Sequence, residues 1–323
     1  MTLPPFEVME PTSLREASEM LAAFGERARV LANGTDLLVS LKKRSMFDVH
    51  PPPPKGQSWA GQPHPLAGAE APEVLISLGR VPGLVGCHLS RTGALVLGPM
   101  TTMTELAGDG RVRRQYTALA EGAAAIGAPT IRNRATLGGN LCHARPAADT
   151  AGPAIVLDAV MAALSIEGAR TVPADDFILA PGRSALDEGE ILEAVALPPP
   201  LPHQGSAYCK LINRATLEIS IVSVAACVTR DGPAGHITGA RIAMGAVGPR
   251  PLRAPSAEQR LIGAEPTAEV LDEAGRAAVL DASPIDDHRG TAGYRNELIR
   301  VLTRRAVGRA AERATAARGG ADG

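Results

Sequence analysis

The stretch Ile131-Arg-Asn-Arg-Ala-Thr-Leu-Gly-Gly-Asn-Leu-Cys142, continued by His143-Ala-Arg-Pro-Ala-Ala-Asp149, carries more information about the fold than any other part of the sequence. Glycines without side chains let a backbone loop wrap closely around a diphosphate or the edge of a flavin. Asp149 stands where a carboxylate could take a ribityl or ribose hydroxyl. The residues alone fit equally well a tight glycine turn followed by a helix cap at Asp149.

A second glycine loop, Leu31-Ala-Asn-Gly-Thr-Asp-Leu-Leu38, follows a predicted buried strand and begins a predicted helix over residues 37–44. Free amides at a helix start, the helix dipole and the Thr35 hydroxyl together make a phosphate site. Gly34 lets the backbone approach an anion, and Asn33 is the non-glycine residue best suited to a left-handed turn. The alternative is an ordinary strand-to-helix turn.

Around these loops the chain alternates predicted strands and helices. A Ser13-Leu-Arg-Glu16 capping box begins the first helix. Four further strands are predicted at 190–197, 206–212, 220–229 and 237–245 in one antiparallel sheet. Helices over about 268–280 and 292–314 close the unit, and the arginines of the last helix are interpreted as a solvated face, with a subunit contact as the alternative.

The composition is that of a folded protein of two or three packed units. The 323 residues are 45% hydrophobic and 21% charged, and Lys+Arg 33 against Asp+Glu 34 leaves a net charge of -1. That balance, with 2% aromatic residues, argues against a nucleic-acid partner. The sequence shows neither a secretion signal nor an apolar run that could span a bilayer, so we expect a cytoplasmic chain.

The 4 cysteines form no Cys-x-x-Cys pair, so an iron–sulfur cluster that serves this chain must belong to a partner. We interpret them as free structural thiols. The sequence contains no convincing Gly-x-Gly-x-x-Gly after a strand, no Walker sequence and no pattern that implies a catalytic triad. These absences weaken the nicotinamide dehydrogenase and nucleotide hydrolase hypotheses.

Three motifs in order, Asn33-Gly-Thr-Asp-Leu-Leu38, Thr130-Ile-Arg-Asn-Arg-Ala-Thr-Leu-Gly-Gly-Asn-Leu141 and Pro146-Ala-Ala-Asp149, resemble the flavin subunit of molybdenum hydroxylases. That family includes xanthine dehydrogenases, molybdenum-type carbon monoxide dehydrogenases, nicotinate-type hydroxylases and hydroxybenzoyl-CoA reductases. The resemblance covers nearly the whole chain except a proline-rich stretch. Further matches are Ala207-Tyr-Cys-Lys-Leu-Ile-Asn-Arg214, Ser223-Val-Ala-Ala226 and Pro284-Ile-Asp-Asp-His-Arg-Gly-Thr-Ala-Gly-Tyr-Arg295.

The resemblance implies an α+β fold: a two-lobed FAD-binding domain of the vanillyl-alcohol-oxidase/PCMH type, followed by an α+β C-terminal domain. FAD lies extended between the lobes in this family. The implied segments are FAD-binding lobe 1 at 1–55, lobe 2 at 56–176 with a proline-rich insertion at about 45–72, the C-terminal domain at 177–290, and a C-terminal helix and tail at 291–323.

The resemblance also implies a cofactor site without catalytic or metal-binding side chains. In its pattern, Ala32, Asn33, Gly34, Thr35, Asp36 and Leu37 hold the diphosphate; Thr136, Gly138, Gly139 and Asn140 complete that cradle; Asp149 binds a hydroxyl of the flavin chain; Ile191 and Leu192 lie on a strand against the cofactor; and Lys210 lies near the flavin ring.

The sequence departs from the family pattern in two places. Asn33 replaces one of two usual glycines, which predicts slightly weaker FAD binding. The proline-rich stretch is an insertion relative to the usual connection. The nearest branch is the hydroxybenzoyl-CoA reductases, which commonly carry an extra four-iron cluster. Cys142 stands where its first ligand would be, but the other cysteines of that insertion are absent, so we do not expect the cluster.

The implied function is electron transfer within a larger complex. A molybdenum cofactor in a large subunit transforms the substrate, and two-iron two-sulfur clusters in a small subunit connect it to the FAD, which exchanges electrons with an external acceptor. One alternative is a self-contained FAD-dependent oxidoreductase of the same fold, for which His143 is the tempting acid or base. Another is a scaffold without flavin, against which the glycine loops and Asp149 argue.

Overall fold

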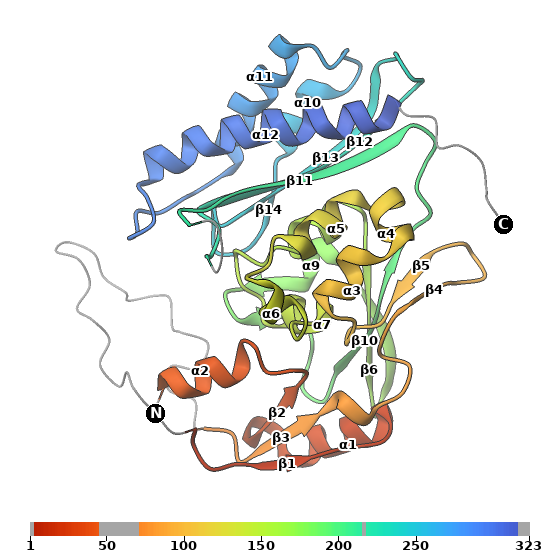
Figure 1. The fold of residues 1–323 in the computed structure, drawn as a ribbon, viewed down its shortest axis with the longest axis vertical. Coiled ribbons are helices and arrows are strands. Elements are labelled where there is room, and N and C mark those ends of the chain that lie inside the picture. Colours follow the sequence, from red (N-terminus) through yellow and green to blue (C-terminus); the bar gives the residue numbers. More distant parts are fainter. Residues whose placement is uncertain (1–2, 45–70, 215–217, 316–323) are drawn as a thin grey trace.

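The computed structural model describes residues 3–44, 71–214 and 218–315, which stack three sheets along the long axis of the molecule (Figure 1). Most of the predicted proline-rich insertion lies outside these residues. The first sheet is small and parallel, and helix α1 packs beside it. Its order is β1-β3-β2, with β1 at Glu7–Met9, β3 at Val74–Ser77 and β2 at Ala28–Leu31, together with α1 at Leu14–Phe24, short 3-10 helices at Gly25–Arg27 and Leu78–Arg80, and α2 at Leu37–Arg44.

The start of α1 differs in detail from the predicted capping box. The Ser13 Oγ accepts the Glu16 amide at 3.1 Å, as expected. The Glu16 carboxylate reaches one residue further back, where it accepts the amide of Thr12 at 2.7 Å and its hydroxyl at 3.0 Å. On its inner face α1 buries Ser18, whose hydroxyl donates to the carbonyl of Gly189 at 2.8 Å. This bond ties the first unit to the second.

The middle unit is an antiparallel sheet of order β4-β5-β10-β6-β7 with helices α3 to α8 against it (Figure 1). Helix α3 begins at a full capping box of Thr102 and Glu105. The elements are β4 Cys87–Leu89, β5 Leu95–Leu97, α3 Met103–Gly108, α4 Gly110–Gln115, α5 Thr117–Ala124, α6 Pro129–Arg132, α7 Leu137–Cys142, α8 Ala151–Val156, β6 Val160–Ser165, β7 Gly168–Pro173, α9 Ala174–Phe177, the β8–β9 ribbon Ile178–Ala180 and Arg183–Ser184, and β10 Ile191–Leu197.

Two strand assignments correct the sequence-based expectation. Strand β10 lies between β5 and β6 in the middle sheet and does not join the C-terminal sheet. The predicted boundary after residue 176 therefore cuts through the middle unit. Strand β3 is the central strand of the first sheet, so the predicted boundary after residue 55 separates it from both neighbours. An apolar run of residues indicates that a strand forms. Which strand it pairs with depends on how the rest of the chain is folded.

The C-terminal unit is an antiparallel sheet, β11-β12-β13-β14, between two layers of helices. On one face lie α10 and α12, with α11 packed against both, and on the other α5 and α8 of the middle unit. Strand β12 is buried along nearly all its length because helices cover both faces. The elements are β11 Gln204–Leu211, β12 Val222–Arg230, β13 Ile237–Gly245, β14 Leu252–Arg253, α10 Pro255–Leu261, α11 Ala268–Ala278, a 3-10 helix Val279–Asp281 and α12 Ala292–Thr315.

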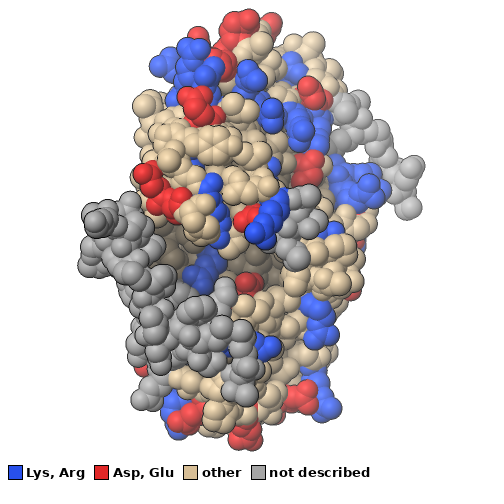
Figure 2. Space-filling model, turned by 60° about the vertical axis from the view of Figure 1, so that its left-hand side comes forward, with Lys and Arg blue, Asp and Glu red and all other residues tan. Residues whose placement is uncertain are grey.

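The arginines of α12 are only partly a solvated face. Arg295 is buried, with its guanidinium on the carbonyls of Ile221 and Ala246, and Arg313 pairs with Glu121 at 2.6 Å. On the face of the molecule in Figure 2, basic and acidic side chains are interspersed, in keeping with the net charge of -1. Among the described residues, no helix combines the length and apolar character that a bilayer crossing needs.

Candidate functional site

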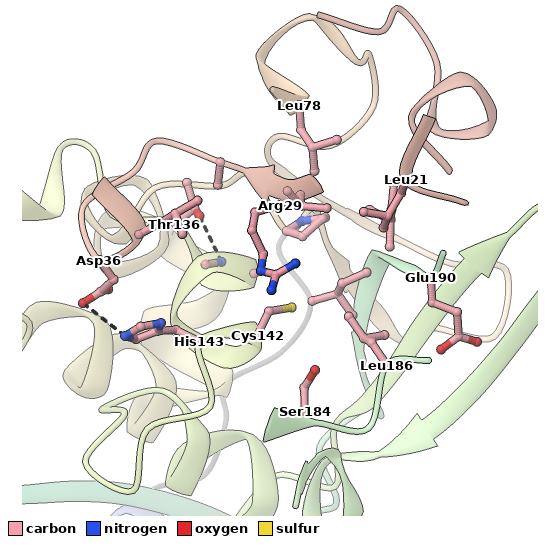
Figure 3. Close-up of a pocket in the computed structure, with 18 of the residues that line it drawn as sticks. Leu21, Arg29, Asp36, Leu78, Thr136, Cys142, His143, Ser184, Leu186 and Glu190 are labelled. Carbon is pink, nitrogen blue, oxygen red and sulfur yellow. Dashed lines mark hydrogen bonds and ion pairs between the residues drawn. The ribbon is translucent and has the colours of Figure 1, made fainter. Parts of the chain in front are cut away.

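A cleft between the first and middle units contains two neighbouring cavities, of about 590 Å³ and about 260 Å³, and Glu218 and Ile219 of the C-terminal unit also line the smaller one. The larger lies among the β2–α2 loop, α7, the β8–β9 ribbon and the start of β10 (Figure 3). Their combined volume is in the range of protein sites that bind small molecules and cofactors. Five residues line both cavities and so mark their junction: Thr35, Asp36, Thr136, His143 and Arg145.

The β2–α2 loop brings the start of an eight-residue helix to this junction. Helix α2 is closed by the bond from the Leu38 amide to the Gly34 carbonyl at 3.1 Å, so the amides of residues 35–37 belong to its open first turn. Gly34 has a φ of +75°, and a Cβ there would lie 2.7 Å from Leu38 Cδ1. The loop thus supplies amides and a positive dipole end, as the sequence predicted for an anion site.

Asn33 does not occupy the left-handed turn for which the sequence suggested it. Gly34 alone of the two adopts that conformation. The Asn33 side chain instead donates to the carbonyl of Arg134 at 2.8 Å, and this bond connects the two glycine loops. An asparagine at this position therefore has a bridging role that a glycine could not fulfil.

The Gly138-Gly139 pair does not supply the free amides that we expected. The Gly138 amide donates to the carbonyl of Pro99 at 2.7 Å, and the Gly139 amide to the Oγ1 of Thr136 at 3.1 Å. The glycines are required by packing: a Cβ on Gly138 would lie 2.6 Å from the Pro99 Cβ, and one on Gly139 2.8 Å from the Thr136 hydroxyl. The same Cβ on Gly139 would lie 3.9 Å from Ala32, so the bare helix face leaves room beside the first loop.

Asp149 and Lys210 meet each other beside the smaller cavity. The Asp149 carboxylate accepts Lys210 Nζ at 2.8 Å, the Tyr208 hydroxyl at 2.6 Å and the Ser220 hydroxyl at 3.2 Å. Asp149 does not cap α8, whose first residue follows Thr150 without a side-chain cap. Burial raises the pKa of Asp149, and Lys210 opposes that shift. Because the three donors come from the C-terminal unit, this cluster joins it to the middle unit.

The other predicted residues divide between the two cavities. Asn140 lines the smaller one and accepts the amide and the hydroxyl of Thr150 at 3.2 Å and 2.6 Å. Ile191 and Leu192, both nearly fully buried, line the larger one at the start of β10. Leu21 lines it too, and gives this end of the cleft an apolar wall (Figure 3).

Several cleft residues were not among those predicted from the sequence. Arg29 points its guanidinium into the larger cavity, with Nη1 held by the carbonyls of Glu26 and Ala28 (Figure 3). Cys142 lies in the same wall, where burial raises the pKa of its thiol to about 12, so the thiol stays neutral. An arginine within a predicted strand does not by itself indicate that its side chain lines a cleft. Only the strand's position beside the glycine loop could have indicated it.

An FAD fits the residues of this cleft. The open first turn of α2 suits a diphosphate, and the bare face of Gly139 leaves space beside it. The apolar wall of Leu21, Ile191 and Leu192 suits an aromatic ring system. Two cavities that share lining residues at the phosphate-type site suit a molecule with a ring at each end.

Comparisons with known proteins agree with this fit. Residues 65–200 match the family described as FAD binding domain in molybdopterin dehydrogenase, and residues 207–310 the family described as CO dehydrogenase flavoprotein C-terminal domain. The chain is 31% identical to a xanthine dehydrogenase FAD-binding subunit of Escherichia coli O157:H7, over 92% of this chain and 93% of that one. It is 31% identical to a carbon monoxide dehydrogenase medium chain of Hydrogenophaga pseudoflava, over 95% and 97%.

Solved structures show the same likeness. A chain of the carbon monoxide dehydrogenase from Hydrogenophaga pseudoflava superposes with a TM-score of 0.85 at 31% identity, over 97% of this chain and 99% of that one. A chain of quinoline 2-oxidoreductase from Pseudomonas putida 86 gives 0.84 at 28% identity, over 98% and 100%.

Fold and site together define a two-lobed FAD-binding protein with an added α+β domain, which confirms the predicted fold class and cofactor. This chain belongs to the family of FAD-binding subunits of molybdenum hydroxylases, the family that its glycine motifs indicated.

Proposed function

We propose that this chain holds an FAD that carries electrons between the iron–sulfur clusters of a small partner subunit and an external acceptor. A large partner subunit with the molybdenum cofactor would transform the substrate. The observation that carries the proposal is the two-cavity cleft, with the amide-bearing start of α2 at its junction, in a chain that aligns over nearly its whole length with subunits of such enzymes. The cytoplasm remains the compartment predicted from the sequence.

In this proposal, Gly34 to Leu37 bind the diphosphate, and Ile191 and Leu192 pack against the adenine ring in the larger cavity. The flavin lies toward the smaller cavity, where Asp149 lines the wall and is paired with Lys210 behind it, which itself lines neither cavity. When bound, the FAD supplies the capacity to accept electrons singly or in pairs. The side chains bind and orient it and shield it from water.

Flavin content tests this function. The complex, purified after co-expression of this chain with its partner subunits, should contain one FAD per copy of this chain, with flavin and iron–sulfur bands in its visible spectrum. A complex that turns over normally without flavin would contradict the proposal. Activity of this chain alone on a small organic substrate would instead favour the self-contained flavoenzyme.

Substituting Gly34 with Ala should weaken FAD binding. A side chain at this φ costs about 1 to 2 kcal/mol, and here its Cβ also meets Leu38 beside the larger cavity. Gly83→Ala is the matched control, because Gly83 has a φ of +80° and nothing within 4 Å of its Cβ, and it lines neither cavity. Both variants should lose stability in thermal unfolding, Gly34→Ala the more because of the contact with Leu38. Only Gly34→Ala should raise the dissociation constant for FAD, and equal affinities in the two variants would count against the loop's role.

A further inference from the structure

We propose that Arg145, held in place by His143, is the cation that binds the diphosphate of FAD at the junction of the two cavities. This inference rests on the proposed function and adds a residue to it. Neither residue belongs to the glycine loops, and both lie in the segment that follows α7.

The position of Arg145 is the first reason. Arg145 and His143 both line the larger and the smaller cavity, as do Thr35 and Asp36 of the β2–α2 loop. The arginine therefore shares the junction with the open amides of α2. Arg29, by contrast, lines only the larger cavity, and its Nη1 is taken by two carbonyls.

The backbone between the two side chains is built to place them. Ala144 is fully buried and has a φ of +50°, a left-handed conformation that a non-glycine residue adopts only where its surroundings enforce it. Its carbonyl accepts the amide of Gly182 at 2.8 Å, which anchors the segment to the β8–β9 ribbon. The residues on either side both face the cavities as a result.

His143 orients the guanidinium. The Nε of Arg145 donates to His143 Nε2 at 3.0 Å, and that nitrogen lies 3.8 Å from Asp36 Oδ1 (Figure 3 shows the His143–Asp36 contact). With Nε engaged, the two terminal nitrogens of the half-buried arginine remain, and they make no hydrogen bond with the described residues. A guanidinium in this state presents a fork that matches phosphate oxygens.

Charge is the second reason. A diphosphate brings two negative charges to a loop that itself contains the carboxylate of Asp36. The amides of Gly138 and Gly139 cannot offset this charge, because both are already bonded within the protein. A positive side chain at the junction would offset it in addition to the amides of α2, and Arg145 lies there.

The test compares three ligands on the full chain after removal of flavin. FAD and ADP contain the diphosphate, and riboflavin contains no phosphate. In Arg145→Ser, the dissociation constants for FAD and ADP should rise roughly 10- to 100-fold, while that for riboflavin should stay unchanged. Arg145→Lys should give an intermediate loss, because it keeps the charge without the fork. The ratio of the riboflavin to the FAD dissociation constant should also fall as the salt concentration rises. It should fall more steeply for the wild type than for Arg145→Ser.

Arg91→Ser is the control, because Arg91 is an exposed arginine between β4 and β5 that lines neither cavity. It should bind all three ligands like the wild type. FAD affinity within twofold of wild type in Arg145→Ser would overturn the role of Arg145 and leave the proposed function intact. Parallel losses for riboflavin, or an equal loss in Arg91→Ser, would overturn it as well. A wild-type chain that binds no FAD would overturn the proposed function itself.

Discussion

Replacing Lys210 with Met is expected to lower the free energy of unfolding by about 3 to 5 kcal/mol. The substitution keeps an aliphatic side chain of similar length and removes the cation from a buried pair whose atoms are 2.8 Å apart. Asp149 would then be a buried carboxylate with only the hydroxyls of Tyr208 and Ser220 beside it. Because the pair joins the middle and C-terminal units, its loss weakens the contact between them.

This loss should depend on pH. Burial already raises the pKa of Asp149 in the folded protein, and removing Lys210 removes a group that lowers it. A carboxyl with a raised folded-state pKa binds its proton more tightly in the folded than in the unfolded chain, so stability falls as pH rises through that range. In Lys210→Met the folded-state pKa is higher still. The deficit relative to wild type should therefore be largest at neutral pH and shrink as pH falls toward the ordinary carboxyl range.

The measurement is the urea unfolding midpoint of the full chain at neutral and mildly acidic pH. The matched variant is the double substitution Lys210→Met with Asp149→Asn, which removes both charges and leaves an amide beside Tyr208 and Ser220. It should recover much of the stability at neutral pH. A single variant within about 0.5 kcal/mol of wild type, or a double variant no better than the single one, would show that the pair does not join the units as described.

The second large effect is expected at Gly205, where Ala should cost about 3 kcal/mol. Strand β11 passes so close to α12 that a Cβ on Gly205 would overlap the carbonyl oxygen of Ala310 and lie 2.6 Å from the amide of Ala314. Both are backbone atoms, so no rotamer change can relieve the overlap. Helix α12 must therefore move away from the sheet, which loosens the packing between the helix and the sheet.

Gly239→Ala on β13 is the control for this prediction, because its Cβ would meet only the side chain of Thr229 at 3.6 Å, an ordinary contact. That variant should be neutral or slightly more stable, since Gly loses more backbone freedom on folding. Thermal unfolding of both variants decides the matter. Similar melting temperatures for Gly205→Ala and Gly239→Ala would mean that α12 tolerates the displacement, against the packing argument.

The parts of the fold that follow from local pattern were predictable. The capped helix α1, the long helix α12 and the strands of the C-terminal sheet lie close to where apolar spacing placed them. The family followed from the order of several motifs along the chain, and the comparisons confirm it. The left-handed turn of this loop was predicted from its residues, but at Asn33, whereas Gly34 adopts it.

The site itself was predicted less completely, for a consistent reason. Residues such as Arg29 and Arg145 gave no local sign of their role, because a cleft is formed by segments distant in sequence. The contribution of Asn33 was similarly hidden, since its partner is a carbonyl in the other glycine loop.

The sequence by itself indicated most of the helices and strands and the phosphate-type loop before α2, because these depend on spacing, turn residues and capping within a few residues. Only the tertiary structure decided that β10 belongs to the middle sheet, that the amides of Gly138 and Gly139 are already bonded, and that Asp149 pairs with Lys210. Backbone groups pair with any strand or carbonyl that the chain path brings near, so their partners are not written in local sequence. A buried carboxylate likewise takes the cation that folding places beside it.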